Sequence, residues 1–159
     1  MNQKDFPVPP AVEEWEFVRE LNRPAARKLR KQRSRMMGEE ADLSGGARMV
    51  REFPDLEQLL DTAYADLEAL LLENGLIGNY PVITRKAETS CFEEYSINIT
   101  PERCVIAAAD TEGIRRGIFE FEELLLSADG PFVRCQTIRR KPWLKTLLNG
   151  FIRKKNRSI

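Results

Sequence analysis

The sequence has 159 residues, enough for one domain with a sizeable hydrophobic core. Hydrophobic residues make up 42% and charged residues 31%, a composition that excludes an intrinsically disordered chain. Basic and acidic side chains number 25 each and histidine is absent, which excludes serine and cysteine triads of the usual kind and removes the commonest metal ligand.

The first 46 residues are expected to form an arm and a linker ahead of the main fold. Residues 1–10 are rich in proline and predict an extended segment. Apolar side chains recur every three positions over residues 11–21, which predicts a short helix, and Pro24 ends this helix or begins a second one. Residues 38–46 (GEEADLSGG) have the composition of a linker. The chain is therefore expected to carry a helical N-terminal extension.

The compact domain is expected between residues 47 and 142, and residues 47–53 predict its first strand. Pro54 then suits the first turn of a helix. From Leu56 to Leu71 the apolar residues follow the i, i+3, i+4, i+7 spacing of a helix face, and Asn74-Gly75 is a typical helix end. Burying so many leucines requires a sheet beneath this helix.

Three strands are expected after this helix. Residues 80–88 predict one strand, with Pro81 near its start. The segment EYSINIT (94–100) alternates apolar and polar positions, as a half-buried strand does, whereas CVIAAAD (104–110) is a short apolar run typical of a central strand. Because only a tight turn separates the two segments, residues 95–108 are predicted to form a hairpin.

A second helix is predicted over residues 111–127, with Asp110 or Thr111 as its N-cap. Residues 131–138 (PFVRCQTI) alternate again and predict a last strand. This order of elements indicates an α+β fold, a two-layer α/β sandwich with two helices on one face of a mainly antiparallel sheet. Residues 143–159 lose the pattern and are expected to form a basic C-terminal tail.

The balanced charge hides a separation along the chain. Residues 23–35 carry seven basic side chains and no acidic one, residues 37–129 carry twenty acidic against seven basic, and residues 130–159 carry nine basic and none acidic. This pattern is compatible with a nucleic-acid or other anionic partner bound through residues 23–35 and 134–157. It is equally compatible with basic ends that lie against the acidic body or against a missing neighbour, so nucleic acid is not the favoured partner.

A cytoplasmic protein is expected, because no secretory signal and no membrane-spanning run are visible. Cys91, Cys104 and Cys135 are odd in number and form no C-x-x-C pair, which favours reduced thiols over a disulfide framework or a zinc site. Cys104 and Cys135 fall in predicted strands and are expected to be small core residues. We assign no cofactor and no metal.

Residues 94–143 resemble part of a known class of proteins. A strand (EYSINIT), a tight turn, a strand ending in Ala-Asp (CVIAAAD), the helix DTEGIRRGIFEFEELL and the Arg-rich stretch FVRCQTIRRKPWL follow one another. This succession resembles the second half of the N-terminal α/β domain of family 20 glycoside hydrolases, the β-N-acetylhexosaminidases, and the front domain of family 67 α-glucuronidases. The helix of those families carries two glycines four residues apart, here Gly113 and Gly117. Since residues i and i+4 share one helix face, these glycines let the helix backbone approach the sheet closely.

The resemblance implies a non-catalytic accessory domain that packs against a C-terminal catalytic barrel. Catalysis in family 20 is associated with an adjacent Asp-Glu pair on that barrel, and no Asp in this sequence is followed by Glu. A barrel needs about 200 residues or more and is expected outside this sequence, so the chain is either an isolated front domain or a truncated one. No catalytic residue is assigned.

Four pairs of adjacent glutamates occur, at positions 13–14, 39–40, 93–94 and 122–123. A glycosidase needs two carboxyl groups about 5–10 Å apart that face one cleft, one of them with a raised pKa. Neighbours in a strand point to opposite faces, and neighbours in a helix diverge by about 100°. All four pairs are therefore expected on solvated faces.

The stretch Arg139-Arg140-Lys141-Pro142-Trp143 is the most distinctive surface segment. A tryptophan beside a strand end normally seeks cover, so Arg139, Arg140 and Trp143 are expected to form a docking strip for a following domain. An exposed basic tail with one incidental aromatic residue is the alternative. The structural and docking candidates are thus these three residues together with Gly113 and Gly117.

Overall fold

The computed structural model describes residues 27–30 and 36–142. The strands within these ranges are β1 (Glu40–Asp42), β2 (Ala47–Arg51), β3 (Tyr80–Lys86), β4 (Tyr95–Ile99), β5 (Cys104–Ala108), β6 (Phe132–Arg134) and β7 (Gln136–Arg140). Five of them form the main sheet in the order β2-β3-β5-β4-β7, and β1 pairs with β6 in a second, two-stranded sheet. The helices are α2 (Asp61–Glu73) and α3 (Thr111–Ser127).

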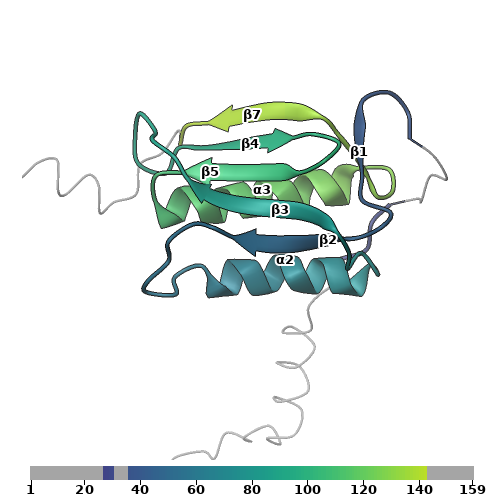
Figure 1. Ribbon diagram of the computed structural model, residues 1–159, viewed down its shortest axis with the longest axis horizontal. Coiled ribbons are helices and arrows are strands. Elements are labelled where there is room, and N and C mark those ends of the chain that lie inside the picture. Colours follow the sequence, from purple (N-terminus) through teal and green to yellow (C-terminus); the bar gives the residue numbers. More distant parts are fainter. Residues whose placement is uncertain (1–26, 31–35, 143–159) are drawn as a thin grey trace, which may run out of the picture.

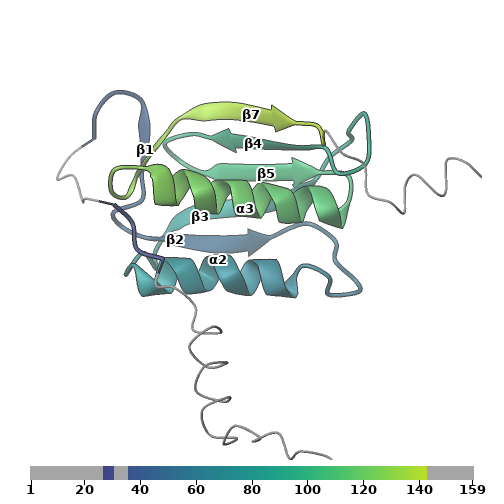
Figure 2. The same cartoon turned by 180° about the vertical axis from the view of Figure 1, so that it is seen from behind.

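The two helices lie side by side on one face of the main sheet, and neither covers the other face (Figures 1 and 2). Strand β2 runs parallel to β3, and β3 runs parallel to β5, whereas the other three pairings are antiparallel. The parallel pair β2–β3 requires a long crossover, which α2 supplies. The predicted two-layer α+β sandwich is confirmed, as is the hairpin formed by β4 and β5. The predicted N-terminal helix lies outside the described residues.

The core lies between the helix layer and the sheet. Helix α3 begins where the sequence predicts, at the N-cap Asp110, whose Oδ1 accepts the backbone N–H of Gly113 at 2.8 Å. Ile118 and Phe121 on its inner face are fully buried. Helix α2 is tied to β3 by a 2.8 Å hydrogen bond between the hydroxyl groups of Tyr64 and Thr84, so these two buried hydroxyl groups satisfy each other.

The predicted helix start at Pro54 is wrong, because α2 begins only at Asp61. Gln58 has a left-handed φ of 57°, which a helix cannot accommodate. The Asp55 carboxylate accepts two backbone N–H groups just ahead of α2, at 3.0 and 2.8 Å, and thereby closes a turn. Leu56, assigned by its spacing to the buried helix face, is consequently 96% exposed.

The expected linker at residues 38–46 is wrong in its middle part. Strand β1 pairs antiparallel with β6, and Ala41 and Leu43 are fully buried in the core. The folded unit therefore begins before Ala47. A strand of three residues is too short to show a clear alternation of apolar and polar side chains. The flanking glycines and acidic residues therefore indicate a linker when the composition alone is considered.

The single strand expected over residues 131–138 is in fact two strands in two sheets. Strand β6 pairs with β1, and β7 joins β4 at the edge of the main sheet. Cys135 lies between β6 and β7, and its backbone N–H donates to the carbonyl of Glu39 at 3.0 Å. Only Cys135 separates the two strands, so the sequence contains no loop that would reveal the change of sheet.

Candidate functional site

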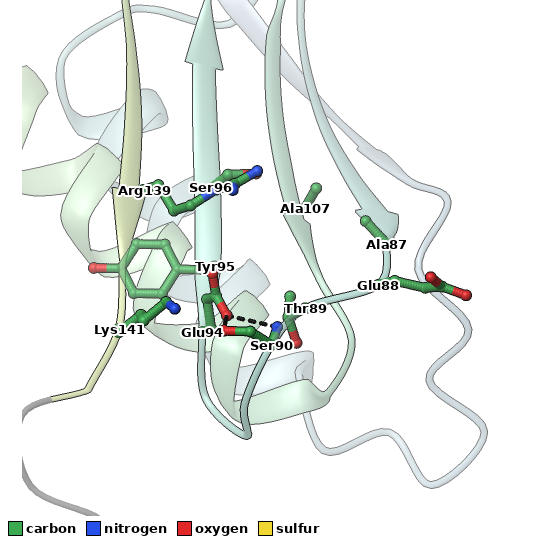
Figure 3. A pocket seen from close by; sticks show the side chains of 10 residues that line it. All are labelled: Ala87, Glu88, Thr89, Ser90, Glu94, Tyr95, Ser96, Ala107, Arg139 and Lys141. Carbon is green, nitrogen blue, oxygen red and sulfur yellow. Dashed lines mark hydrogen bonds between the residues drawn. The ribbon is translucent and has the colours of Figure 1, made fainter.

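A hollow of about 370 Å³ opens where β3 ends, beside β4, β5 and β7 (Figure 3). Ser96 on β4 is paired in register with Ala107 on β5 and with Arg139 on β7. Their chain neighbours Ile97 and Ile106 are buried in the core, so these three side chains belong to the sheet face that the helices leave uncovered. The hollow exists because Ser96 and Ala107, at the two central positions, carry small side chains.

Glu94 lines this hollow but is engaged by the loop beside it. Its Oε2 accepts the backbone N–H of Ser90 at 2.7 Å and the Ser90 hydroxyl at 2.6 Å. The hydroxyl bond is the main reason why the pKa of Glu94 is lowered from its ordinary value, and the carboxylate stays ionised near neutral pH. A glycosidase general acid needs the opposite shift. Glu88, the second carboxylate of the lining, points away from Glu94 and is exposed (Figure 3).

The expectation that the glutamate pairs lie on solvated faces is wrong for Glu93, Glu94 and Glu122, which are all buried. Glu93 has a left-handed φ of 65°, its backbone N–H donates to Asp110 at 2.9 Å, and its Oε2 accepts from Arg116 at 3.0 Å. Glu93 thus fixes the loop before β4 to the start of α3. Burial by a loop and by a second helix depends on tertiary contacts, which residue spacing does not encode.

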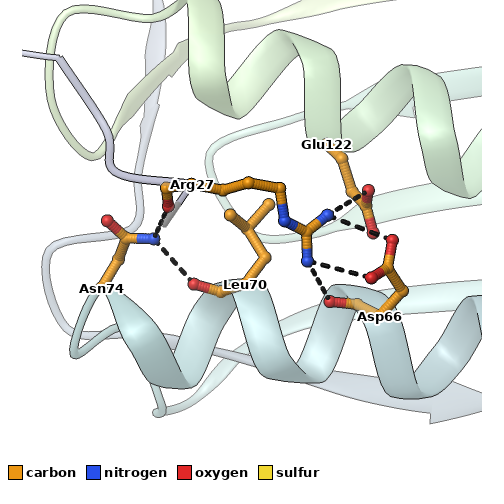
Figure 4. Close-up of polar contacts among 5 residues, drawn as sticks. All are labelled: Arg27, Asp66, Leu70, Asn74 and Glu122. Atoms are coloured by element: carbon orange, nitrogen blue, oxygen red, sulfur yellow. Dashed lines mark hydrogen bonds and ion pairs between the residues drawn. The ribbon is translucent and has the colours of Figure 1, made fainter. Parts of the chain in front are cut away.

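Glu122 of α3 meets Asp66 of α2 across the guanidinium group of Arg27 (Figure 4). Desolvation by burial is the main reason why the pKa of Glu122 is raised to about 7, and the negative charge of Asp66 adds to it, while Arg27 acts in the opposite direction. Glu122 does not line the hollow beside Glu94. The carboxyl has the pKa of a general acid but lies in a contact between helices.

The glycines Gly113 and Gly117 lie where α3 crosses β4 and β5. A Cβ atom on Gly113 would lie 2.7 Å from the Ala108 Cβ and 2.8 Å from the Glu94 carbonyl oxygen. A Cβ atom on Gly117 would lie 2.4 Å from Cγ2 of Ile106. Since real Cβ atoms do not come so close to other heavy atoms, only glycine permits this spacing between helix and sheet.

The residues of the expected docking strip do not act together within the described chain. Arg139 lies on the uncovered sheet face at the hollow, whereas Arg140 donates to Glu120 of α3 at 3.1 Å on the helix side. The Tyr95 hydroxyl donates to the same glutamate. Trp143 lies outside the described residues. Arg27 and Arg140, one from each basic segment, both pair with acidic side chains of the helices.

Cys104 is fully buried, as predicted, and Cys135 is half-buried. Burial raises the pKa of both thiols, so neither is predisposed to act as a nucleophile. In residues 27–30 and 36–142, no three His, Cys, Asp or Glu side chains are placed to hold a metal ion. Neither helix that the structure describes is long and apolar enough to cross a bilayer.

Comparison with solved structures finds that this chain is similar to segments of larger enzymes. A β-N-acetylhexosaminidase from Bacteroides fragilis NCTC 9343 is 23% identical, and the match covers 66% of this chain and 22% of that enzyme with a TM-score of 0.48. A family 138 glycoside hydrolase that targets the pectin rhamnogalacturonan II is 17% identical, and the match covers 62% of this chain and 12% of that enzyme with a TM-score of 0.53. A chitobiase from Flavobacterium johnsoniae is 14% identical, and the match covers 72% of this chain and 20% of that enzyme with a TM-score of 0.43. No protein-family model matches the sequence, and no curated protein does.

The described part of the chain shares its fold with a segment of the family 138 enzyme. The resemblance to an α/β domain of glycoside hydrolases, inferred from residues 94–143, is thus confirmed as a likeness of fold. The chain spans less than a quarter of the length of each of these three structures.

Proposed function

We propose that this chain is a non-catalytic accessory domain of a glycoside hydrolase-type protein and packs against a catalytic barrel supplied elsewhere. The fold shared with a segment that makes up 12% of a family 138 enzyme carries the proposal. The chemistry of the described residues supports it, because Glu94 is held ionised by Ser90, and Glu93 and Glu122 are engaged by arginines. A cytoplasmic location, inferred from three free cysteines, is part of the same proposal.

The barrel is proposed to contact the uncovered face of the main sheet and the segment that follows β7. Arg139 of β7 is exposed on that face. Ser96 of β4 and Ala107 of β5 lie next to it in register, and their small side chains leave room for a partner's side chain. Trp143, which lies outside the described residues, is proposed as an apolar anchor for the same partner. In this arrangement the helix layer serves to keep the sheet rigid.

The first test is catalysis by the purified chain on a panel of aryl glycosides. We expect no turnover above the uncatalysed rate. Turnover that is lost in Glu94→Gln and kept in the matched control Glu88→Gln would refute the non-catalytic assignment, because both residues line the same hollow.

The second test is association with the barrel encoded in the same or a neighbouring reading frame. We expect the separately produced proteins to form a complex on size-exclusion chromatography, and Arg139→Ala to weaken it about tenfold. Arg134→Ala, an exposed arginine on β6, is the control and should leave the affinity unchanged. Absence of any complex would count against the accessory role. Salt-sensitive binding of DNA by the chain alone would favour the anionic-partner alternative.

A further inference from the structure

Helix α2 leaves an apolar groove of about 670 Å³ along β2, the edge strand of the main sheet (Figure 1). We call it the edge groove, and it is lined mainly by small and apolar side chains, those of Ala47, Met49, Ala65, Ala69, Leu72 and Ile77. Leu72 and Ile77 are 69% and 59% exposed. Large exposed apolar side chains that gather in a groove are typical of a surface that another element covers.

The charges of the edge groove limit what can cover it. Glu68 is paired with Arg51 of β2 at 3.0 Å, so its charge is balanced. The other charged residue of the lining is Arg48, which is exposed. An occupant that suits this surface is therefore an apolar element with acidic side chains beside its apolar face.

Residues 11–21 of this chain have that composition, and we call them the N-terminal segment. The segment lies outside the described residues, and its sequence predicts a helix with an apolar stripe of Val12, Trp15, Val18 and Leu21. It also contains four glutamates and one arginine, which gives it the charge opposite to that of Arg48.

The chain enters the described part of the structure close to one end of the edge groove. The Asn74 amide donates to the carbonyl oxygen of Arg27 at 2.9 Å and fixes that residue at the end of α2 (Figure 4). Ile77 follows Asn74 by three residues, so their Cα atoms lie within about 11 Å of each other. Residues 22–26 can span about 17 Å. The N-terminal segment is therefore within reach of the edge groove.

We propose that the N-terminal segment docks as a helix in the edge groove of the same chain. Leu21, the residue of the stripe nearest to Arg27, contacts Leu72. Trp15 lies about 9 Å further along the helix and reaches the part of the groove at Ala65, about 10 Å from Leu72 along α2, where small side chains leave room for an indole ring. The proposal does not depend on the accessory function.

Limited digestion of the full chain with trypsin tests the docking, because the bond after Arg19 is cleaved only while the N-terminal segment is out of the groove. We expect Leu72→Glu to raise the rate of this cleavage about tenfold, and Trp15→Ala to raise it similarly. The double variant should add little, since either change alone already releases the segment. Leu56→Glu, at a leucine that is 96% exposed ahead of α2, is the matched control and should leave the rate unchanged.

A second groove variant keeps the test decisive if Leu72→Glu folds poorly, as judged by circular dichroism. Ala65→Glu changes an exposed position of α2 at the other end of the groove and should also raise the rate of cleavage after Arg19. Equal rates in the unmodified chain and in the folded groove variants would overturn the proposal. A dimer on size-exclusion chromatography that Leu72→Glu dissociates and Trp15→Ala does not would also overturn it, because a second copy would then occupy the groove.

Discussion

At Gly117 the backbone of α3 lies so close to the sheet that the identity of a single residue sets the spacing between the two layers. The nearest sheet atom to a Cβ atom placed there would be Cγ2 of Ile106, and Ile106 is itself fully buried and paired on both sides. A β-branched side chain in a packed strand has no rotamer that would make room. The conflict must therefore be relieved by moving the helix.

Gly117→Ala is expected to lower the free energy of unfolding by about 1–3 kcal/mol, because overpacking outweighs the gain in helix propensity. Urea denaturation measures the change. Glu123→Ala, at an exposed position of the same helix, is the matched control and should stay within about 0.5 kcal/mol of the unmodified chain. A Gly117→Ala variant as stable as the control would mean that helix and sheet are not in this tight contact.

At the scale of elements, Asp110 joins two segments that are neighbours in space but lie apart in the sequence. Its Oδ1 caps α3 through the Gly113 amide, and its Oδ2 accepts the amide of Glu93 from the loop before β4. The helix start and the strand start are therefore stabilised by one carboxylate. This explains why the left-handed backbone of Glu93 is tolerated there.

Asp110→Ala should lower the free energy of unfolding by about 1–2 kcal/mol, because it leaves two backbone N–H groups without their acceptor. Thermal unfolding followed by circular dichroism gives the size of the loss. Asp110→Asn keeps one acceptor oxygen and should recover part of it, whereas Glu123→Ala, at an exposed position of α3, provides the comparison. Equal stability of the alanine and asparagine variants would argue against the double acceptor role.

At the scale of the whole molecule, two buried carboxyl groups make the stability depend on pH in opposite directions. The raised pKa of Glu122, about 7 when folded, contributes stability that is complete below about 4.5 and is lost as the pH rises toward 7. The lowered pKa of Glu94 contributes stability at pH values above the ordinary pKa of a glutamate. This stability is lost as the pH falls through the lower pKa that Glu94 has in the folded state. The two effects occupy different pH ranges and can be separated.

As the pH rises from 4.5 to 7, the ionisation of Glu122 should lower the free energy of unfolding of the unmodified chain by about 1–3 kcal/mol. Urea titrations at several pH values, compared between the unmodified chain and Glu122→Gln, isolate this contribution. The variant should have a flatter pH dependence in that range only. Parallel curves for the two proteins would mean that Glu122 is solvated in the folded state.

The parts of this molecule that sequence patterns predict are those fixed by local periodicity and capping. Helix α3 occupies the predicted residues because Asp110 is a strong N-cap and the apolar positions repeat at helical spacing over its whole length. The end of α2 at Asn74-Gly75 follows likewise from the left-handed φ of 67° that Gly75 adopts. The hairpin of β4 and β5 follows from an alternating segment and a short apolar run on the two sides of a tight turn.

Tertiary structure decided the rest, because those features depend on contacts between residues far apart in the sequence. The pairing of β1 with β6 buries Ala41 and Leu43, and only that pairing distinguishes them from linker residues. The turn closed by Asp55 overrides the apolar spacing that would have extended α2 to Leu56. The contact of Arg27 with Glu122 joins residues that no local pattern relates. Local free energies thus determined which elements form, and the packing of distant segments determined where they end and which charges they bury.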